Sequence, residues 1–175
     1  MSNKQIIYVV IAVAIAGSLV AYFVSRKGSS APESELSQQG GQGLVTREVA
    51  PENIAVPEKD SGNVPENVAK PEQVSPAAAG VEEDMRTFSI TVSGNKFSPD
   101  TVIARVGDII KLNFTAVDKN YEFTQPDYGF KAQLPKGQTV SVTFGVNGEG
   151  KFLFYCGSCG GPSQGPVGYI IVVKR

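Results

Sequence analysis

The sequence predicts an all-β C-terminal domain, an eight-stranded Greek-key sandwich or barrel, preceded by one transmembrane α-helix and a disordered linker. Three observations lead to this fold class. Residues 6–24 form an uncharged apolar run, residues 28–85 are rich in Pro and Glu, and residues 86–175 carry short β-rich runs separated by turn residues. The expected domains are therefore a membrane anchor over residues 1–27, a linker over 28–85 and a folded domain over 86–175.

The anchor prediction rests on the length of the apolar run. Its 19 residues, IIYVVIAVAIAGSLVAYFV, are enough for a helix to cross about 30 Å of hydrocarbon. A cleaved signal peptide is the alternative, because Ala14-Ile15-Ala16 has the small residues of a cleavage site. The run continues past Ala16 to Val24, which favours an uncleaved anchor.

The linker prediction rests on composition. Residues 28–84 contain no aromatic residue, and residues 28–85 hold three basic against eleven acidic side chains, a net charge of −8. Such a segment buries too little apolar surface to offset its chain entropy. We expect a flexible, acidic tether.

The folded domain is predicted from alternating and β-branched runs. No helix-period pattern of helical length occurs in residues 86–175, and Gly, Pro, Asn and Asp stand where strands must reverse. The expected core positions are Ile90, Val92, Ile103, Leu112, Phe114, Val142, Phe152, Phe154, Ile170 and Val172. The expected strands span residues 87–92, 101–105, 109–116, 121–124, 130–134, 139–144, 151–156 and 169–173.

The whole chain of 175 residues contains no His, two Cys and a formal net charge of −1. Without His, the Ser-His-Asp and Cys-His hydrolases, His-ligated zinc sites and unmodified blue-copper sites are excluded. The near-zero net charge argues against a dedicated nucleic-acid binder.

Five motifs of the folded domain, taken in chain order, resemble a known family. They are Phe97-Ser98-Pro99, Val106-Gly107-Asp108, Leu134-Pro135-Lys136-Gly137, Phe154-Tyr155-Cys156 and Gly168-Tyr169-Ile170-Ile171-Val172. This order resembles the cupredoxin superfamily, and most of all the copper-A domain of cytochrome c oxidase subunit II and the small single-domain bacterial cupredoxins.

The resemblance implies a single-pass protein of the cell membrane with its C-terminal domain extracytoplasmic. It implies copper binding and electron transfer, so that the chain is not an enzyme itself and is at most an electron-transfer subunit. The partners that it implies are the membrane and a respiratory or other membrane protein, with no nucleic acid.

The family's copper ligands map onto four residues of this chain. The first His of the family falls at Tyr121, its Cys at Cys156, the second His of the mononuclear pattern at Cys159, and the axial ligand at Gln164. Both imidazole positions are therefore occupied by other residues. The soft thiolates of Cys156 and Cys159 favour Cu(I), with Gln164 or Tyr121 as a poor third ligand.

Three interpretations of the two cysteines stay open at this point. The first is a degraded copper site, and the second is a metal-free interaction module in which Cys156 and Cys159 form a disulfide, as neighbouring thiols do in an oxidising compartment. The third is a thiol-disulfide oxidoreductase, because Cys156-Gly157-Ser158-Cys159 has the C-x-x-C spacing. Such redox motifs depend on a helix N-terminus to lower the thiol pKa, whereas Cys156 is predicted to end a strand.

Overall fold

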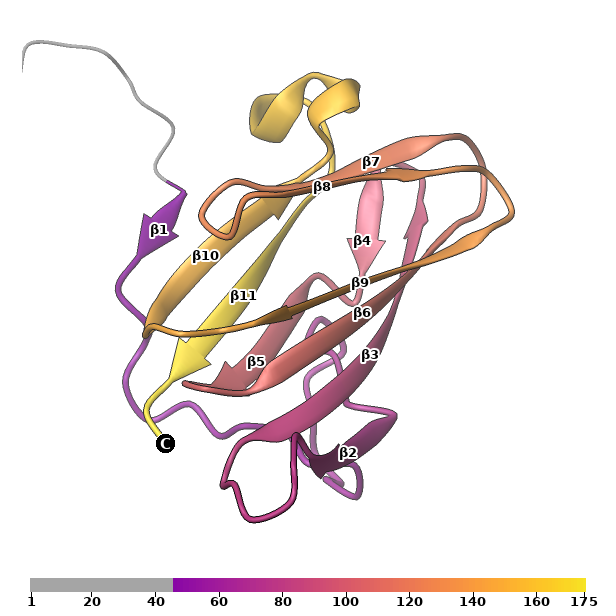
Figure 1. Cartoon of the computed structure of the whole chain (residues 1–175). Coiled ribbons are helices and arrows are strands. Elements are labelled where there is room, and N and C mark those ends of the chain that lie inside the picture. The colour runs from indigo at the N-terminus through magenta and orange to yellow at the C-terminus, as the bar shows by residue number, and fades with distance from the viewer. Residues whose placement is uncertain (1–45) are drawn as a thin grey trace, which may run out of the picture. The chain divides into compact units, whose positions relative to one another are not determined.

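The computed structural model describes residues 46–175, so the predicted anchor over residues 6–24 lies outside the described part of the chain. Within residues 46–175, no helix is long and apolar enough to cross a membrane. This part is built from β-strands and two short 3-10 helices (Figure 1). The all-β prediction is therefore confirmed for the C-terminal domain.

The strands form two sheets. In chain order they are β1 (Arg47–Glu48), β2 (Gln73–Pro76), β3 (Asp84–Ser93), β4 (Lys96–Ser98), β5 (Thr101–Arg105), β6 (Ile109–Ala116), β7 (Tyr121–Gln125), β8 (Phe130–Leu134), β9 (Thr139–Gly145), β10 (Gly150–Tyr155) and β11 (Val167–Val173). One sheet has the order β5-β11-β10-β7-β8, with β1 paired to β10. The other has the order β2-β3-β6-β9, with β4 paired to β3.

All eight predicted strands are present, as β3 and β5 to β11, with ends that differ by at most three residues. Alternation between the core and the surface is most regular in β6, where every second side chain is buried, whereas β5 and β7 are buried along most of their length. Strands β1, β2 and β4 were not predicted. They are two to four residues long and too short to show a period.

The core lies between the two sheets. All ten predicted core residues are buried, and the most exposed of them, Val142, is only 7% exposed. Four phenylalanines meet at the centre with ring centroids 4.7 to 6.2 Å apart: Phe97, Phe114, Phe123 and Phe154. Such tilted and edge-to-face contacts add to the stabilisation that burial of the rings supplies.

Gly168 in β11 is required by close packing. A Cβ atom at this position would lie 2.5 Å from the backbone oxygen of Asp100 and would overlap the Phe154 ring. Because the Asp100 carbonyl also accepts a hydrogen bond from the Tyr169 N–H at 2.7 Å, the backbone there is held in place.

Residues 46–83, here called the N-terminal strap, pack against the domain, although the sequence predicts them as part of a linker over 28–85. Strand β1 pairs with β10, and β2 pairs with β3. Between them, residues 67–69 run beside the start of β5, where Val68 bridges Thr101 and the Ala69 N–H donates to the Thr101 oxygen at 2.7 Å. The strap thus adds backbone pairs at three places on the two sheets.

The physical reason for this difference is that the strap does not need a core of its own. It is extended and satisfies its backbone groups on sheet edges, and its few buried residues, among them Pro57, Ala69 and Pro71, fill places at the surface of the domain. Composition alone counts the apolar residues of a segment and not the edges that a neighbouring domain offers it.

A buried arginine fixes the strap to the first core strand. The side chain of Arg86 is 0% exposed, and its Nε donates to Asp108 at 2.8 Å. Its two Nη atoms donate to the Pro57 carbonyl at 3.1 Å, to both Glu58 oxygens at 3.1 and 3.2 Å, and to Asp84 at 3.0 Å. Although burial opposes it, hydrogen bonding and charge from Glu58 and Asp108 raise the pKa of Arg86.

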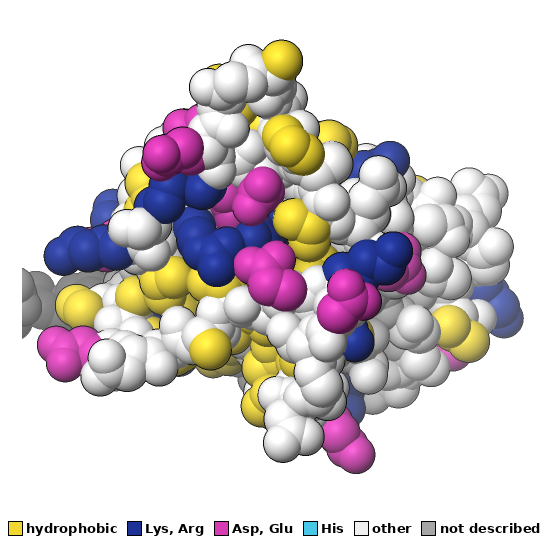
Figure 2. Space-filling view, turned by 90° about the horizontal axis from the view of Figure 1, so that it is seen from below, with side chains coloured by type: hydrophobic (Ala, Val, Ile, Leu, Met, Phe, Trp, Pro, Cys, Tyr) yellow, Lys and Arg dark blue, Asp and Glu magenta, His cyan; other side chains and the backbone are white. Residues whose placement is uncertain are grey.

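Asp108 is the buried partner in this network, and it too is 0% exposed. Besides Arg86, it accepts backbone N–H groups from Asp84 and Arg105 at 3.2 and 3.0 Å, and it pairs with the guanidinium of Arg175. Figure 2 shows the molecule from below, and on the face in view Lys and Arg side chains lie beside Asp and Glu side chains.

Candidate functional site

The two cysteines lie in the loop that joins β10 to β11, residues 156–166, here called the Cys loop. This loop contains two short 3-10 helices, η1 (Gly157–Cys159) and η2 (Gly161–Ser163), which stand at the top of Figure 1. Cys156 and Cys159 form a disulfide with their Cα atoms 5.3 Å apart. Cys156 is fully buried, whereas Cys159 is partly exposed.

Three glycines of the Cys loop are explained by close contacts. A Cβ at Gly157 would overlap the Glu122 carboxylate, and a Cβ at Gly165 would lie 2.9 Å from the Gly161 oxygen and from the Cys159 Cβ. Gly160 has φ = 93°, a left-handed conformation that favours glycine. The glycine content of the loop therefore follows from its tight fold over β7.

Glu122 of β7 contacts the Cys loop with both its backbone and its side chain. Its N–H donates to the Cys156 Sγ at 3.4 Å. The side chain is 6% exposed, and its carboxylate accepts hydrogen bonds from the Thr124 hydroxyl at 3.0 Å and from Gln133 at 2.8 Å. Lys131 Nζ lies 3.3 Å from the same carboxylate.

The charge state of Glu122 follows from these neighbours. Burial acts to raise the pKa of this carboxyl, but the hydrogen bonds from Thr124, Lys131 and Gln133 and the charge of Lys131 outweigh burial and lower the pKa. Glu122 is therefore a buried, ionised carboxylate beside the disulfide.

Tyr121, at the position of the family's first His, is 1% exposed and belongs to the hydrophobic core. Its hydroxyl donates to Asp118 at 2.8 Å and accepts the N–H of Asn95 at 3.3 Å. Burial, followed by the hydrogen bond to Asp118, raises the pKa of Tyr121. The phenol thus has polar partners of its own.

Gln164 is exposed, and its backbone oxygen accepts a hydrogen bond from the Asn95 side chain at 2.8 Å. Asn95 therefore links Tyr121 to the far part of the Cys loop by two hydrogen bonds. In the part of the chain that the structure describes, no three His, Cys, Asp or Glu side chains are grouped so that they could hold a metal ion.

The residues present do not fit a Cu(II) centre of the blue-copper or copper-A kind. Such centres use imidazole nitrogen, and the chain has no His. The sulfurs of Cys156 and Cys159 are bonded to each other, and a disulfide has no thiolate to give to a metal. When the disulfide is reduced, two adjacent thiolates provide a donor set that fits Cu(I).

A family model for the cupredoxin-like domain matches residues 68–172, which is 105 of the 175 residues. The chain belongs to the cupredoxin-like family. No curated protein matches this cupredoxin-like chain significantly.

Solved structures similar to this cupredoxin-like chain include two copper-binding proteins and a subunit of a cytochrome oxidase. An apo copper-binding protein solved by NMR is 23% identical, covers 51% of this chain and 88% of its own, and has a TM-score of 0.44. The metal-binding domain of the Cu(I)-exporting ATPase CopA of Streptococcus pneumoniae D39 is 17% identical over 55% and 93% of the two chains, with a TM-score of 0.46. The periplasmic domain of cytochrome oxidase subunit II of Bradyrhizobium japonicum is 16% identical over 51% and 84%, with a TM-score of 0.45.

Glu122 is the site residue that sequence reasoning missed. A signal was present, because Glu122 is the one charged residue in the otherwise uncharged run 121–125 of a predicted strand. A charge between Tyr121 and Phe123 in a buried strand needs partners, and so marks a candidate site.

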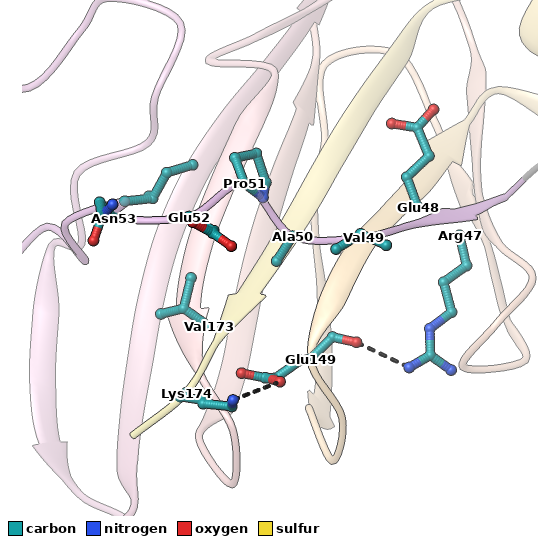
Figure 3. Close-up of a pocket in the computed structure, with 11 residues that line it drawn as sticks. Arg47, Glu48, Val49, Ala50, Pro51, Glu52, Asn53, Glu149, Val173 and Lys174 are labelled. Carbon is teal, nitrogen blue, oxygen red and sulfur yellow. Dashed lines mark hydrogen bonds and ion pairs between the residues drawn. The ribbon is translucent and has the colours of Figure 1, made fainter.

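A surface pocket lies elsewhere in the cupredoxin-like domain. It is formed by strap residues 47–54 with Glu149, Val173 and Lys174 (Figure 3). Arg47 donates to the Glu149 backbone oxygen at 2.9 Å, and Lys174 Nζ lies 3.9 Å from the Glu149 carboxylate. Because Glu149 precedes β10 and Cys156 follows it, the pocket and the disulfide lie at opposite ends of that strand.

Proposed function

We propose that this protein is a membrane-anchored, extracytoplasmic cupredoxin-like protein that binds copper as Cu(I) through the reduced thiols of Cys156 and Cys159. It is a binding protein and not an enzyme. The apolar run over residues 6–24 supports the anchor. The topology is the one that the resemblance to cytochrome c oxidase subunit II implies.

The observation that carries the proposal is the placement of two sulfurs in the loop where this family keeps its metal. Cys156 is buried and accepts the Glu122 N–H, which stabilises negative charge on this sulfur, and Cys159 beside it is partly exposed. Reduction of the disulfide by two electrons and two protons gives two thiols, and their loss of protons gives the soft ligands that Cu(I) prefers.

Cu(I) is the cargo in this proposal, and cycling between Cu(I) and Cu(II) is not part of it. Cu(II) is supported by imidazole nitrogen, which the chain lacks. Storage or delivery of Cu(I) fits the donor set better than electron transfer does.

A metal-free interaction module is the second candidate. The observation that favours it is that the Cys loop is held without any metal, by the disulfide and by the hydrogen bonds that join Asp118, Tyr121, Asn95 and Gln164. A thiol-disulfide oxidoreductase has less support, because Cys156 stands before a 3-10 helix of only three residues.

The test is Cu(I) binding by the full chain in detergent, with a colorimetric Cu(I) chelator as competitor. The reduced protein is expected to bind one Cu(I) per chain, and the oxidised protein none. Cys156→Ser and Cys159→Ser should each abolish binding. A reduced wild type that holds no more Cu(I) than the double Ser variant would favour the metal-free module.

The topology is tested separately, in spheroplasts of a bacterial host. Protease added from outside is expected to release residues 46–175 from the membrane fraction. Protection until the cells are lysed would contradict the extracytoplasmic location.

A further inference from the structure

Glu122 is a charged residue in the otherwise uncharged, mostly buried strand β7. The Glu122 side chain is only 6% exposed, and a buried carboxylate costs free energy unless it is paired, so that replacing a buried ion pair by apolar residues of similar volume is often neutral or stabilising. Here three neighbours stabilise the charge: Thr124 on the same strand, and Lys131 and Gln133 on β8. The carboxylate also lies against Gly157, between the two cysteines.

We propose that Glu122, together with Lys131, is a charge gate that sets the rate at which thiols reduce the Cys156–Cys159 disulfide. The inference concerns the site of the proposed function, but it rests on the disulfide and its neighbours and does not require copper.

The two sulfurs are not equivalent in this reaction. Cys159 is partly exposed and Cys156 is fully buried, so an incoming thiolate attacks the Sγ of Cys159. A mixed disulfide forms between the reductant and Cys159, and the Cys156 sulfur leaves as a thiolate. A second thiol of the reductant then displaces Cys159, so that two reductant thiols become one disulfide and the protein gains two thiols.

The gate follows from the charges present during attack. The attacking thiolate brings a negative charge to the Cys loop, and part of that charge passes to Cys156, whose Sγ already accepts the Glu122 N–H. The Glu122 carboxylate repels this negative charge. Lys131 Nζ, at 3.3 Å from the carboxylate, partly neutralises the charge of Glu122 and so weakens the repulsion. The carboxylate therefore slows reduction and the lysine speeds it.

The experiment measures the rate of disulfide reduction in the full chain in neutral detergent, with 2-mercaptoethanol in excess and trapping of free thiols. Glu122→Gln keeps the size of the side chain and removes its charge, and it should raise the second-order rate constant about tenfold. Lys131→Gln should lower it by about two- to threefold, a smaller effect because the Lys131 side chain is 65% exposed.

Opposite signs are the distinguishing result. A merely structural role for the ion pair predicts that both variants loosen the loop and change the rate in the same direction, and this outcome would overturn the proposal. Glu149→Gln, at the other end of β10 and paired with Lys174, is the matched control and should leave the rate unchanged.

Two further arms keep the result decisive. If Glu122→Gln does not fold, the surface variant Lys131→Gln decides alone, since an unchanged or faster rate refutes the gate. A comparison of anionic glutathione with cationic cysteamine should show that Glu122→Gln accelerates the anionic reductant more. If Cu(I) binding fails while the rates shift in opposite directions, only the proposed function is refuted.

Discussion

Arg86 is the residue whose removal tests the energetics of the fold most directly. Arg86→Met keeps much of the side-chain volume but leaves Asp108 buried without its main partner, the Nε of Arg86 at 2.8 Å. Both side chains are 0% exposed, so water cannot replace the lost contact without local opening. Breaking a buried pair from one side costs about 3–5 kcal/mol.

The structure places Arg86→Met at the low end of that range. Asp108 retains the backbone N–H groups of Asp84 and Arg105 and the guanidinium of Arg175. We therefore expect a loss of about 3 kcal/mol in the free energy of unfolding, which corresponds to a fall in Tm of about 10 °C for a domain of this size.

The assay is urea unfolding of a fragment of residues 46–175, the part of the chain that the structure describes. Arg105→Met is the matched control, because the Arg105 side chain also pairs with Glu58 at 3.0 Å but is 30% exposed. Arg105 contacts Asp108 only through its backbone N–H, which the substitution keeps. It should cost less than about 1 kcal/mol.

Arg86→Met should also release the N-terminal strap, since the same side chain holds Pro57 and Glu58. Protease should then cut the strap faster under native conditions. A variant whose stability lies within about 1 kcal/mol of the wild type would refute the view that this buried charge depends on its partners.

Four other predictions follow from single contacts. Burial acts to raise the pKa of Glu58, but the hydrogen bonds and charges of Arg86 and Arg105 outweigh burial and hold this pKa below its ordinary 4.5. The stability that ionised Glu58 contributes is therefore complete above pH 4.5 and is lost as the pH falls through the lower pKa of the folded state. Glu58→Gln should make the stability depend less on pH below 4.5. Gly168→Ala should destabilise the fragment by about 1–3 kcal/mol in urea, because backbone blocks the new methyl group. Tyr128→Phe removes a buried hydroxyl that has no hydrogen-bond partner within residues 46–175, so the Tm should stay the same or rise. Burial raises the pKa of Tyr128 to about 12, and the signal of this phenol should vanish from a spectrophotometric titration of the variant. Replacing Cys156 and Cys159 by Ser should cost about 2 kcal/mol or less, because the closed loop is short.

The sequence predicted the sandwich well for a physical reason. Alternating burial leaves a period of two in strands such as β6, and turns require residue types that are visible in the chain. Strands β1 and β2 and the bridge at Val68 carry no such period. They exist because the domain offers unpaired edges to them, which is a property of the folded sheets and not of the strap.

The candidate site was predicted less completely. The sequence predicted Cys156 as the last residue of a strand, and in the structure that strand, β10, ends one residue earlier at Tyr155, so that both cysteines lie in the Cys loop. Glu122 lies 34 residues before Cys156, and only the pairing of β7 with β10, through Thr124 and Tyr155, brings its strand beside the Cys loop. Contacts of this kind depend on register across strands, which a single sequence does not encode locally.

The strap also determines how the domain responds to force. A pull applied through the N-terminal part of the chain reaches the two residue pairs of β1 first, then the Glu58 ion pairs, then the backbone contacts of residues 67–69, and then β2. Each attachment can open in turn while the two sheets stay closed. The 38 residues of the strap would then span up to about 130 Å when fully extended, before the load reaches β3. The strap therefore lengthens under tension before the sheets that hold the Cys loop are loaded.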